Sequence, residues 1–200
     1  MFRLVRPLAK EIDREIEAAS RCELMRPEFL ATMTGRMTEQ LPPGFVHDRS
    51  RIQLGEGREV FETAKRGFEE WRNFDLEWVK VTNPSARIEI GQIVAVQVHS
   101  LGLWSVNLSQ IVEVAREPLA FGFTYKTTPH HLEEGEERFL LTLDPHSGAV
   151  WYEIEAVSRP RDLTARLGFP VTRMFQRRFA RESLLRMQAG DTSLPDKLIP

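Results

Sequence analysis

Residues 119–154 read LAFGFTYKTTPHHLEEGEERFLLTLDPHSGAVWYEI, and three segments within them alternate apolar residues with others. The alternating side chains are Leu119, Phe121, Phe123 and Tyr125, then Phe139, Leu141 and Leu143, then Val150, Tyr152 and Ile154. A period of two directs such side chains to one face of a β-strand. The breaks at 129–135 and 144–148 are short enough for hairpins. The stretch therefore predicts three consecutive antiparallel strands with one apolar face.

The sheet is expected to continue on the N-terminal side of this stretch. Val94, Val96 and Val98 alternate within residues 90–112, which contain no Asp, Glu, Lys or Arg. This segment is long enough to span a bilayer, but glutamine, serine, histidine and asparagine interrupt it, and such groups are costly in lipid. It therefore predicts two buried strands joined near residues 101–104, and no membrane helix.

Two segments have the three- and four-residue spacing of amphipathic helices. In residues 58–72 the apolar stripe consists of Phe61, Ala64, Phe68 and Trp71. Between Pro170 and Gly190 it consists of Val171, Met174, Phe175, Phe179 and Leu185. Stripes of this kind usually pack against a core. We therefore expect both stripes to be buried, with the C-terminal helix lying across the sheet.

The breaker LPPGF at residues 41–45 divides the chain. Residues 1–42 are interpreted as an N-terminal helical arm, with helical spacing from residue 7 to about residue 34 and an interruption at Pro27. Residues 43–190 form the main domain in this interpretation, and residues 191–200 a flexible tail. The order of elements predicts the α+β class, with an antiparallel sheet and a long C-terminal helix.

Composition excludes several classes of protein. The 200 residues are 42% hydrophobic and 28% charged, with a formal net charge of -2, which is ordinary for a globular protein. A near-neutral chain gives no whole-protein argument for binding nucleic acid or anionic membranes. Cys22 is the single cysteine, so no internal disulfide forms. The N-terminal residues do not have the pattern of a secretory signal, and a cytoplasmic location is expected.

The sequence contains none of the patterns GxSxG, GxxxxGK[ST], GxGxxG or HExxH. A nucleophile elbow, a phosphate-binding loop, a dinucleotide site and a helical zinc site are therefore not indicated. We expect no cofactor and no metal.

Histidines and carboxylates are densest in PHHLEEGEER, residues 129–138. Two imidazoles and four carboxylates in so short a stretch have the chemistry of a metal site or of an acid and base pair. Adjacent histidines, however, point to opposite sides of an extended chain, and charge runs usually mark exposed loops. A solvated hairpin is the favoured interpretation.

A second set of candidates lies within or beside the predicted strands. It consists of Trp104, Asn107, Tyr125 and Tyr152. Buried Tyr and Asn side chains need hydrogen-bond partners, so they are either satisfied core groups or the few polar contacts of an otherwise apolar ligand cavity.

The third candidate is a basic C-terminal segment. Residues 159–186 contain eight arginines against two acidic residues, Asp162 and Glu182. The patch proposed to meet phospholipid head groups or nucleic acid consists of Arg173, Arg177, Arg178 and Arg181. No aromatic residues alternate with these arginines on a strand, as they do in single-strand binding platforms, so a solvated helix face is the favoured interpretation.

Several phrases together resemble one known family. They are FDLEWV at 74–79, GLWSVN at 102–107, FGFTYKTTPHHLEEGEERF at 121–139 and SRPRDLTARLGFPVTRMFQRRFARES at 158–183. The chain is similar in these phrases to the bacterial and plant family catalogued as domain of unknown function 1990. The resemblance implies a START-like or Bet v 1-like helix-grip fold, in which a curved antiparallel sheet wraps around a long C-terminal helix. It implies no reaction.

The leading hypothesis from the sequence is a ligand-binding module. A cavity between the sheet and the C-terminal helix would accept a small hydrophobic or amphipathic molecule, oriented by Asn107, Tyr125 and Tyr152. The first alternative is an enzyme of the cyclase or hydrolase kind using His131 and Glu137, the pair that the family motif retains. The second alternative is a protein that docks membranes or nucleic acid through its arginines.

Overall fold

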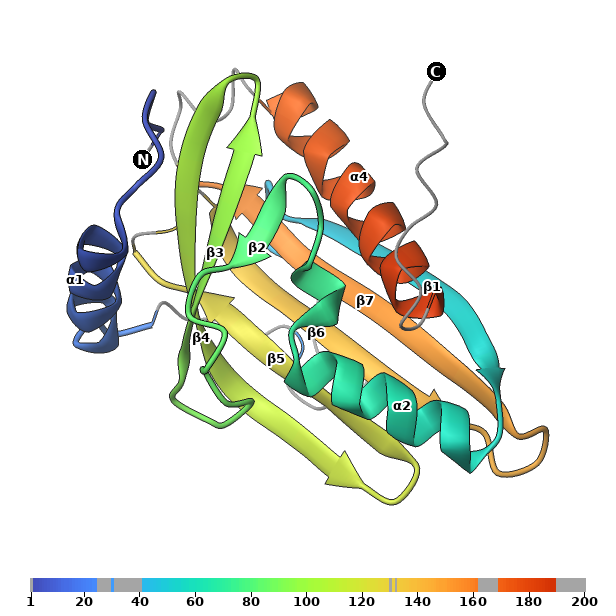
Figure 1. Ribbon diagram of the computed structural model, residues 1–200. Coiled ribbons are helices and arrows are strands. Elements are labelled where there is room, and N and C mark those ends of the chain that lie inside the picture. Colours follow the sequence, from blue (N-terminus) through green and yellow to red (C-terminus); the bar gives the residue numbers. More distant parts are fainter. Residues whose placement is uncertain are drawn as a thin grey trace.

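The computed structural model describes residues 2–24, 30, 41–129, 131, 133–161 and 169–189. A curled seven-stranded sheet has the order β1-β7-β6-β5-β4-β3-β2 (Figure 1). Its strands are β1 (Val46–Glu56), β2 (Val79–Val81), β3 (Ile93–Ser100), β4 (Leu103–Glu117), β5 (Ala120–Thr127), β6 (Glu133–Leu143) and β7 (Ala149–Pro160). The helices are α1 (Ala9–Ser20), α2 (Arg58–Glu69), the 3-10 helix η1 (Arg72–Phe74) and α4 (Phe169–Gln188).

Every pairing between neighbouring strands is antiparallel, and β2 to β7 follow one another in chain order. The predicted α+β class and antiparallel meander are therefore confirmed. The hairpin between β3 and β4 turns at Leu101 and Gly102, whose φ angles of 52° and 73° are the positive values that a two-residue hairpin loop requires. The uncharged segment thus forms two strands, as predicted. None of the helices in the described part of the chain is long and apolar enough to cross a membrane.

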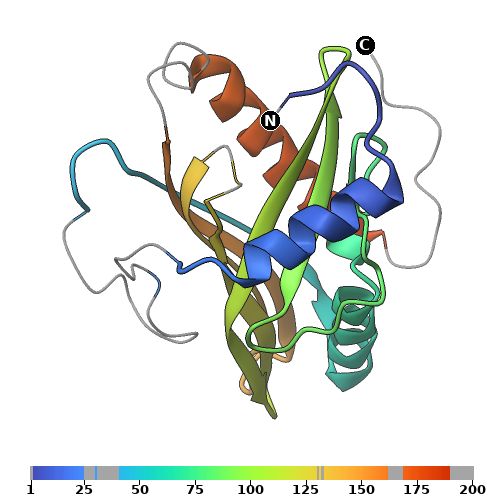
Figure 2. The same ribbon diagram turned by 90° about the vertical axis from the view of Figure 1, so that its left-hand side faces the viewer.

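Helices cover both faces of the sheet. α2, η1 and α4 lie on the concave face, and α1 lies on the opposite face beside β3 and β4 (Figures 1 and 2). The contact of α1 joins Ile12 and Ala19 to apolar side chains of β3 and β4. The helical arm expected over residues 7–34 is thus a helix of 12 residues. Most of its predicted continuation, and the predicted tail at 191–200, lie outside the described residues.

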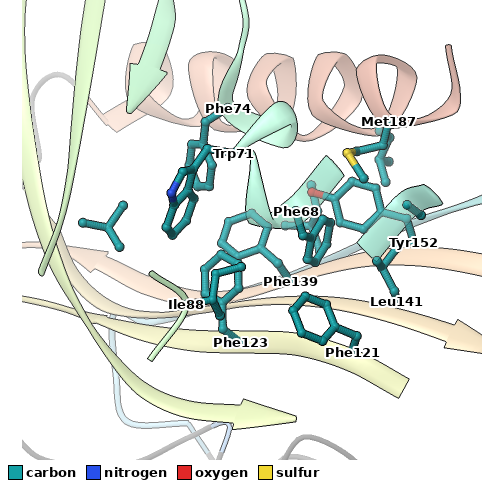
Figure 3. Packing of buried hydrophobic residues seen from close by; sticks show 14 of the residues in the cluster. Phe68, Trp71, Phe74, Ile88, Phe121, Phe123, Phe139, Leu141, Tyr152 and Met187 are labelled. Atoms are coloured by element: carbon teal, nitrogen blue, oxygen red, sulfur yellow. The ribbon is translucent and has the colours of Figure 1, made fainter. Parts of the chain in front are cut away.

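The core on the concave face is built largely from aromatic rings (Figure 3). Phe139 of β6 is fully buried at its centre. Its ring centroid lies 5.1 Å from that of Phe123 and 5.2 Å from that of Phe74. The stripe expected on α2 is buried as predicted, since Phe61 and Phe68 are 2% and 0% exposed.

The buried face of α4 matches the predicted one only in part, since Phe175 and Phe179 pack on the core as predicted. Val171, Met174 and Leu185 were expected inside, but all three are exposed. The residues that pack inward are Phe175, Phe179, Ala180, Ser183, Leu184 and Met187. Small and polar residues belong to this stripe because Ser183 forms a 2.9 Å hydrogen bond with the buried Tyr152 hydroxyl of β7. That bond and the ring contacts of Phe175 and Phe179 together set which side of the helix faces the sheet.

The solvated hairpin predicted for 129–138 is wrong, because Glu133 begins β6 and the following residues are largely buried. Side chains on its outer face pair with opposite charges on neighbouring strands. Lys126 Nζ lies 3.2 Å from Glu136, Arg159 lies 2.9 Å from Glu134, and Arg138 contacts Glu155. Cross-strand pairs compensate charges that would be costly to bury alone. Sequence spacing within one strand does not reveal such partners.

Loss of the central ring is expected to test this packing. Phe139→Ala should lower the free energy of unfolding by about 3–5 kcal/mol, because it removes a fully buried ring from an aromatic cluster. Urea unfolding followed by tryptophan fluorescence measures the change. Met174→Ala, at a position 54% exposed on α4, is the control and should change stability by less than about 1 kcal/mol. Equal losses in the two variants would contradict the assigned core.

Candidate functional site

A cavity of about 240 Å³ lies between the concave face of the sheet and α4. One wall is apolar and aromatic, and it includes Phe74, Trp78, Phe175 and Phe179. The space reaches the surface, since the half-exposed Phe2 also lines it. Drug-sized ligands occupy pockets of about 300–1,000 Å³, so this volume suits a smaller molecule.

Tyr125 and Glu137 form the central polar contact of the cavity. They are directly paired across β5 and β6, with both side chains on the concave face, and the Tyr125 hydroxyl donates a 2.5 Å hydrogen bond to Glu137 Oε2. Burial raises the pKa of Glu137 to about 7; the Tyr125 hydrogen bond opposes this rise, and the charges of Glu133 and Asp48 add to it. Burial and the adjacent carboxylate also raise the pKa of Tyr125 well above its ordinary value. Tyr125 therefore remains a proton donor at neutral pH.

Glu133 supplies a second carboxyl group to the same cavity. Its oxygens accept hydrogen bonds of 2.8 and 2.7 Å from Gln176 Nε2 of α4. Burial raises the pKa of Glu133 to about 7, against the lowering effects of Gln176 and Arg173. Glu133 belongs to the predicted cluster of histidines and carboxylates at 129–138 but was not singled out there, and Gln176 was not predicted. The even spacing of Glu133 and Glu137 on one strand was the available signal, because it places both on one face.

His131 lines the cavity with Glu137, but the hydrogen bond to Glu137 comes from Tyr125. The Nδ1 atom of His131 accepts a 3.0 Å hydrogen bond from the Glu133 backbone N–H, so the ring proton of the neutral form lies on Nε2. Burial lowers the pKa of His131 to about 4, with a further contribution from Arg161. His131 is therefore a neutral hydrogen-bond donor near pH 7. Its neighbour His130 lies outside the described residues.

Asn107 lines the cavity from β4, between Ser105 and Ser109 on the same face of the strand. Its Oδ1 atom is buried and has no hydrogen-bond donor within the described part of the chain. A buried acceptor without a donor is uncommon, and one that faces a cavity is available to a ligand.

Two of the predicted ligand contacts lie away from the cavity. Trp104 is on the outer face of the sheet, where its ring stacks on His99 at 4.2 Å, because it lies an odd number of positions from Asn107 along β4. Tyr152 is fully buried against Phe68 at 5.2 Å and is hydrogen-bonded to Ser183. These contacts make Tyr152 a core residue whose hydroxyl group already has a hydrogen-bond partner.

The predicted arginine patch is partly neutralised. Arg173 pairs with Asp48, and Arg178 pairs with Glu182 at 2.7 Å while lying over the Trp78 ring. Arg177 and Arg181 remain as exposed arginines on α4. In the described ranges, no group of three or more His, Cys, Asp or Glu side chains is placed to hold a metal ion.

Comparisons with known proteins agree with this architecture. An aromatase/cyclase from a Streptomyces species, Zhui, has a solved structure that superposes with a TM-score of 0.50 at 13% identity, covering 72% of this chain and 92% of that one. At this identity the likeness shows the fold alone. The START-like and Bet v 1-like helix-grip arrangement that the resemblance implied is confirmed, with α4 across a curled antiparallel sheet.

Sequence relatives place the chain in a family. A UPF0548 protein of Dictyostelium discoideum is 31% identical over 88% of this chain and 86% of its own length. A UPF0548 protein of Arabidopsis thaliana is 34% identical over 70% of each chain. The family model described as domain of unknown function (DUF1990) matches residues 27–186. The chain therefore belongs to the DUF1990 family, whose relatives in a social amoeba and a plant carry the name UPF0548.

Proposed function

We propose that the protein binds a small amphipathic molecule in the cavity between the sheet and α4. The apolar part of the molecule packs against Phe74, Trp78 and Phe175, and its polar group meets Glu137 and Tyr125. The observation that carries the proposal is the cavity itself, a space of about 240 Å³ with an aromatic wall and a hydrogen-bonding cluster. Pockets of this composition are the usual form of small-molecule sites.

The cost of the polar cluster supports the same proposal. Withdrawing a carboxyl group from water is unfavourable, and the pKa values near 7 of Glu133 and Glu137 express that cost. A core built only for stability would place apolar residues at these positions. Groups with strongly perturbed pKa values in a cavity are candidates for function.

The second candidate function is proton-transfer catalysis on the bound molecule. One observation favours it: a carboxyl group with a pKa of about 7 exchanges a proton readily at neutral pH, as a general acid or base must. The base of this candidate is Glu137, with Tyr125 as the adjacent donor. His131 contributes a neutral Nε2–H, because its pKa of about 4 leaves it uncharged.

Docking of membranes or nucleic acid through α4 has less support. Arg173 and Arg178 are engaged with Asp48 and Glu182, so the free positive charge is smaller than the sequence indicates. Arg177 and Arg181 are the residues left to carry this alternative function.

Ligand binding should raise the melting temperature. At a ligand concentration 100 times Kd the stabilisation is about 2.7 kcal/mol, which corresponds to about 5–10 °C in a chain of this size. A thermal-shift panel of small apolar molecules carrying one polar group tests this. Val96→Phe, which fills the cavity from β3, should abolish the shift, whereas Val171→Phe on the exposed side of α4 should retain it. No shift across the panel, or a shift that survives in Val96→Phe, would contradict the proposal.

The raised pKa of Glu137 predicts a pH-dependent effect on stability. Its folded-state pKa of about 7 exceeds the ordinary 4.5, so the unfolded chain loses its proton first as pH rises, and stability falls between pH 4.5 and 7. Glu137→Gln removes this loss. The variant should be more stable than the parent by about 1–3 kcal/mol at pH 8 and nearly equal to it at pH 4.5. Denaturant unfolding at both pH values measures the difference, and the exposed Glu69→Gln on α2 should show none.

Proton transfer predicts exchange of carbon-bound hydrogen in suitable probes. Small carbonyl compounds incubated with the protein in D2O should gain deuterium next to the carbonyl group, as followed by NMR. Glu137→Gln should reduce the rate by about 100-fold or more, because it removes the base. Exchange that is equal in Glu137→Gln and Glu69→Gln would eliminate the catalytic candidate and leave the binding proposal intact.

A further inference from the structure

We propose that the polar end of the cavity selects an organic cation, a protonated primary amine on an apolar body about the size of an aryl or short alkyl group. This inference rests on the proposed function, since it names the chemical class of the ligand. It is argued from the charges, the hydrogen-bond acceptors and the rings that line one cavity.

Two carboxyl groups of the cavity are not ion-paired with the arginines near it. Arg177 also lines the cavity and Arg173 lowers the pKa of Glu133, but no ion pair joins either arginine to Glu133 or Glu137 among the described residues. Asp48 is paired with Arg173, and Glu136 with Lys126. Glu133 and Glu137 have no ion pair among the described residues, and their hydrogen-bond partners Gln176 and Tyr125 are neutral. A cation bound near these carboxyl groups supplies the positive charge that they lack. An anionic ligand instead adds a negative charge beside two carboxyl groups whose ionisation is already unfavourable.

The hydrogen-bonding groups point to a donor ligand. Asn107 Oδ1 is a buried acceptor that no described residue satisfies, and the oxygens of Glu133 and Glu137 accept further hydrogen bonds when ionised. A primary ammonium group brings three N–H donors and no acceptor, which matches this excess of acceptors. An alcohol brings one donor, and a carboxylate none.

The aromatic wall suits the same class. Phe74 and Tyr125 line the cavity with their ring centroids 6.5 Å apart, next to the Glu137 carboxyl group. Ring faces attract cations, and the attraction strengthens where water is excluded. An apolar body fits against Phe175 and Phe179 farther along the wall.

A metal ion is a weaker occupant. Over the described ranges, the carboxyl and imidazole groups do not form a set of three placed for metal coordination. Nδ1 of His131 already accepts the Glu133 backbone N–H, and Nε2 carries the proton of the neutral ring, so neither nitrogen offers a free lone pair to a metal. Organic cations bind without fixed coordination geometry and tolerate this arrangement.

Amine binding has a distinct pH signature. Glu133 and Glu137 have pKa values of about 7 in the empty cavity, and a bound ammonium ion favours their ionised forms. Binding therefore releases protons, and affinity rises between pH 6 and pH 8. Primary amines stay charged over this range, as lysine does with its pKa of about 10.4. A neutral ligand that accepts a hydrogen bond from a protonated carboxyl group shows the opposite trend.

The experiment compares matched amines, alcohols and carboxylic acids on phenylethyl, hexyl and naphthylmethyl bodies by isothermal titration calorimetry. Titrations at pH 6 and 8, in buffers of different ionisation enthalpy, count the protons released. We expect at least one amine to bind about 10-fold or more tightly than its alcohol at pH 8, proton release on amine binding to be larger at pH 6 than at pH 8, and the acids not to bind. Glu137→Gln should reduce the ratio of amine affinity to alcohol affinity by about 10-fold, and Glu69→Gln should leave that ratio unchanged.

The outcomes separate the inference from the proposed function. If alcohols bind as tightly as the matched amines, or if amine affinity does not rise with pH, the inference fails and the cavity remains a ligand site. If no compound of the three classes binds to the folded protein, both fail. Glu133→Gln provides a second test of the amine preference if Glu137→Gln does not fold, and thermal melting establishes folding for each variant.

Discussion

The position of α4 depends on a small set of ring contacts at one side of the sheet. The ring centroid of Phe179 lies 5.2 Å from that of Phe74 and 6.4 Å from that of Phe139. Farther along the helix, Ser183 is hydrogen-bonded to Tyr152 of β7. These contacts hold the helix above β1, β7 and η1. Because the sheet curls away from the axis of α4, side chains of this helix do not fill the space above β3, β4 and β5. The cavity is thus a consequence of where the helix is anchored.

The polar end of the cavity costs the fold stability, because it holds two buried carboxyl groups. Glu137 accepts the Tyr125 hydroxyl and Glu133 accepts Gln176, so both carboxyl groups are held in place. Neither forms an ion pair among the described residues, although Arg173 lowers the pKa of Glu133, and ionisation costs stability at neutral pH. A binding partner of the right charge relieves that cost, which links occupancy of the cavity to the stability of the fold.

Much of the fold, and part of the site, followed from the sequence. Alternation predicted the strands and placed Tyr125 and Asn107 on the cavity side, because side-chain direction in a strand depends only on local spacing. The buried face of α4 was predicted in part. Phe175 and Phe179 pack on the core, but Val171 and Met174 are exposed, because apolar spacing does not reveal that Ser183 faces Tyr152. Glu133 was read as part of a solvated run because its partner Gln176 is distant in the sequence.

The charged layer on the outer face of β6 has a consequence for how the sheet assembles. Arg138 lies opposite Glu155, and Glu136 lies opposite Val157. Sliding β6 along β7 by two residues in one direction brings Glu136 opposite Glu155, and in the other it brings Arg138 opposite Val157, away from its carboxylates. Both misalignments keep the apolar side chains of the concave face inward, so hydrophobic burial alone does not reject them. The native register is therefore the one that keeps both cross-strand pairs, Arg138 with Glu155 and Arg159 with Glu134, directly opposite each other, and neither misalignment does so.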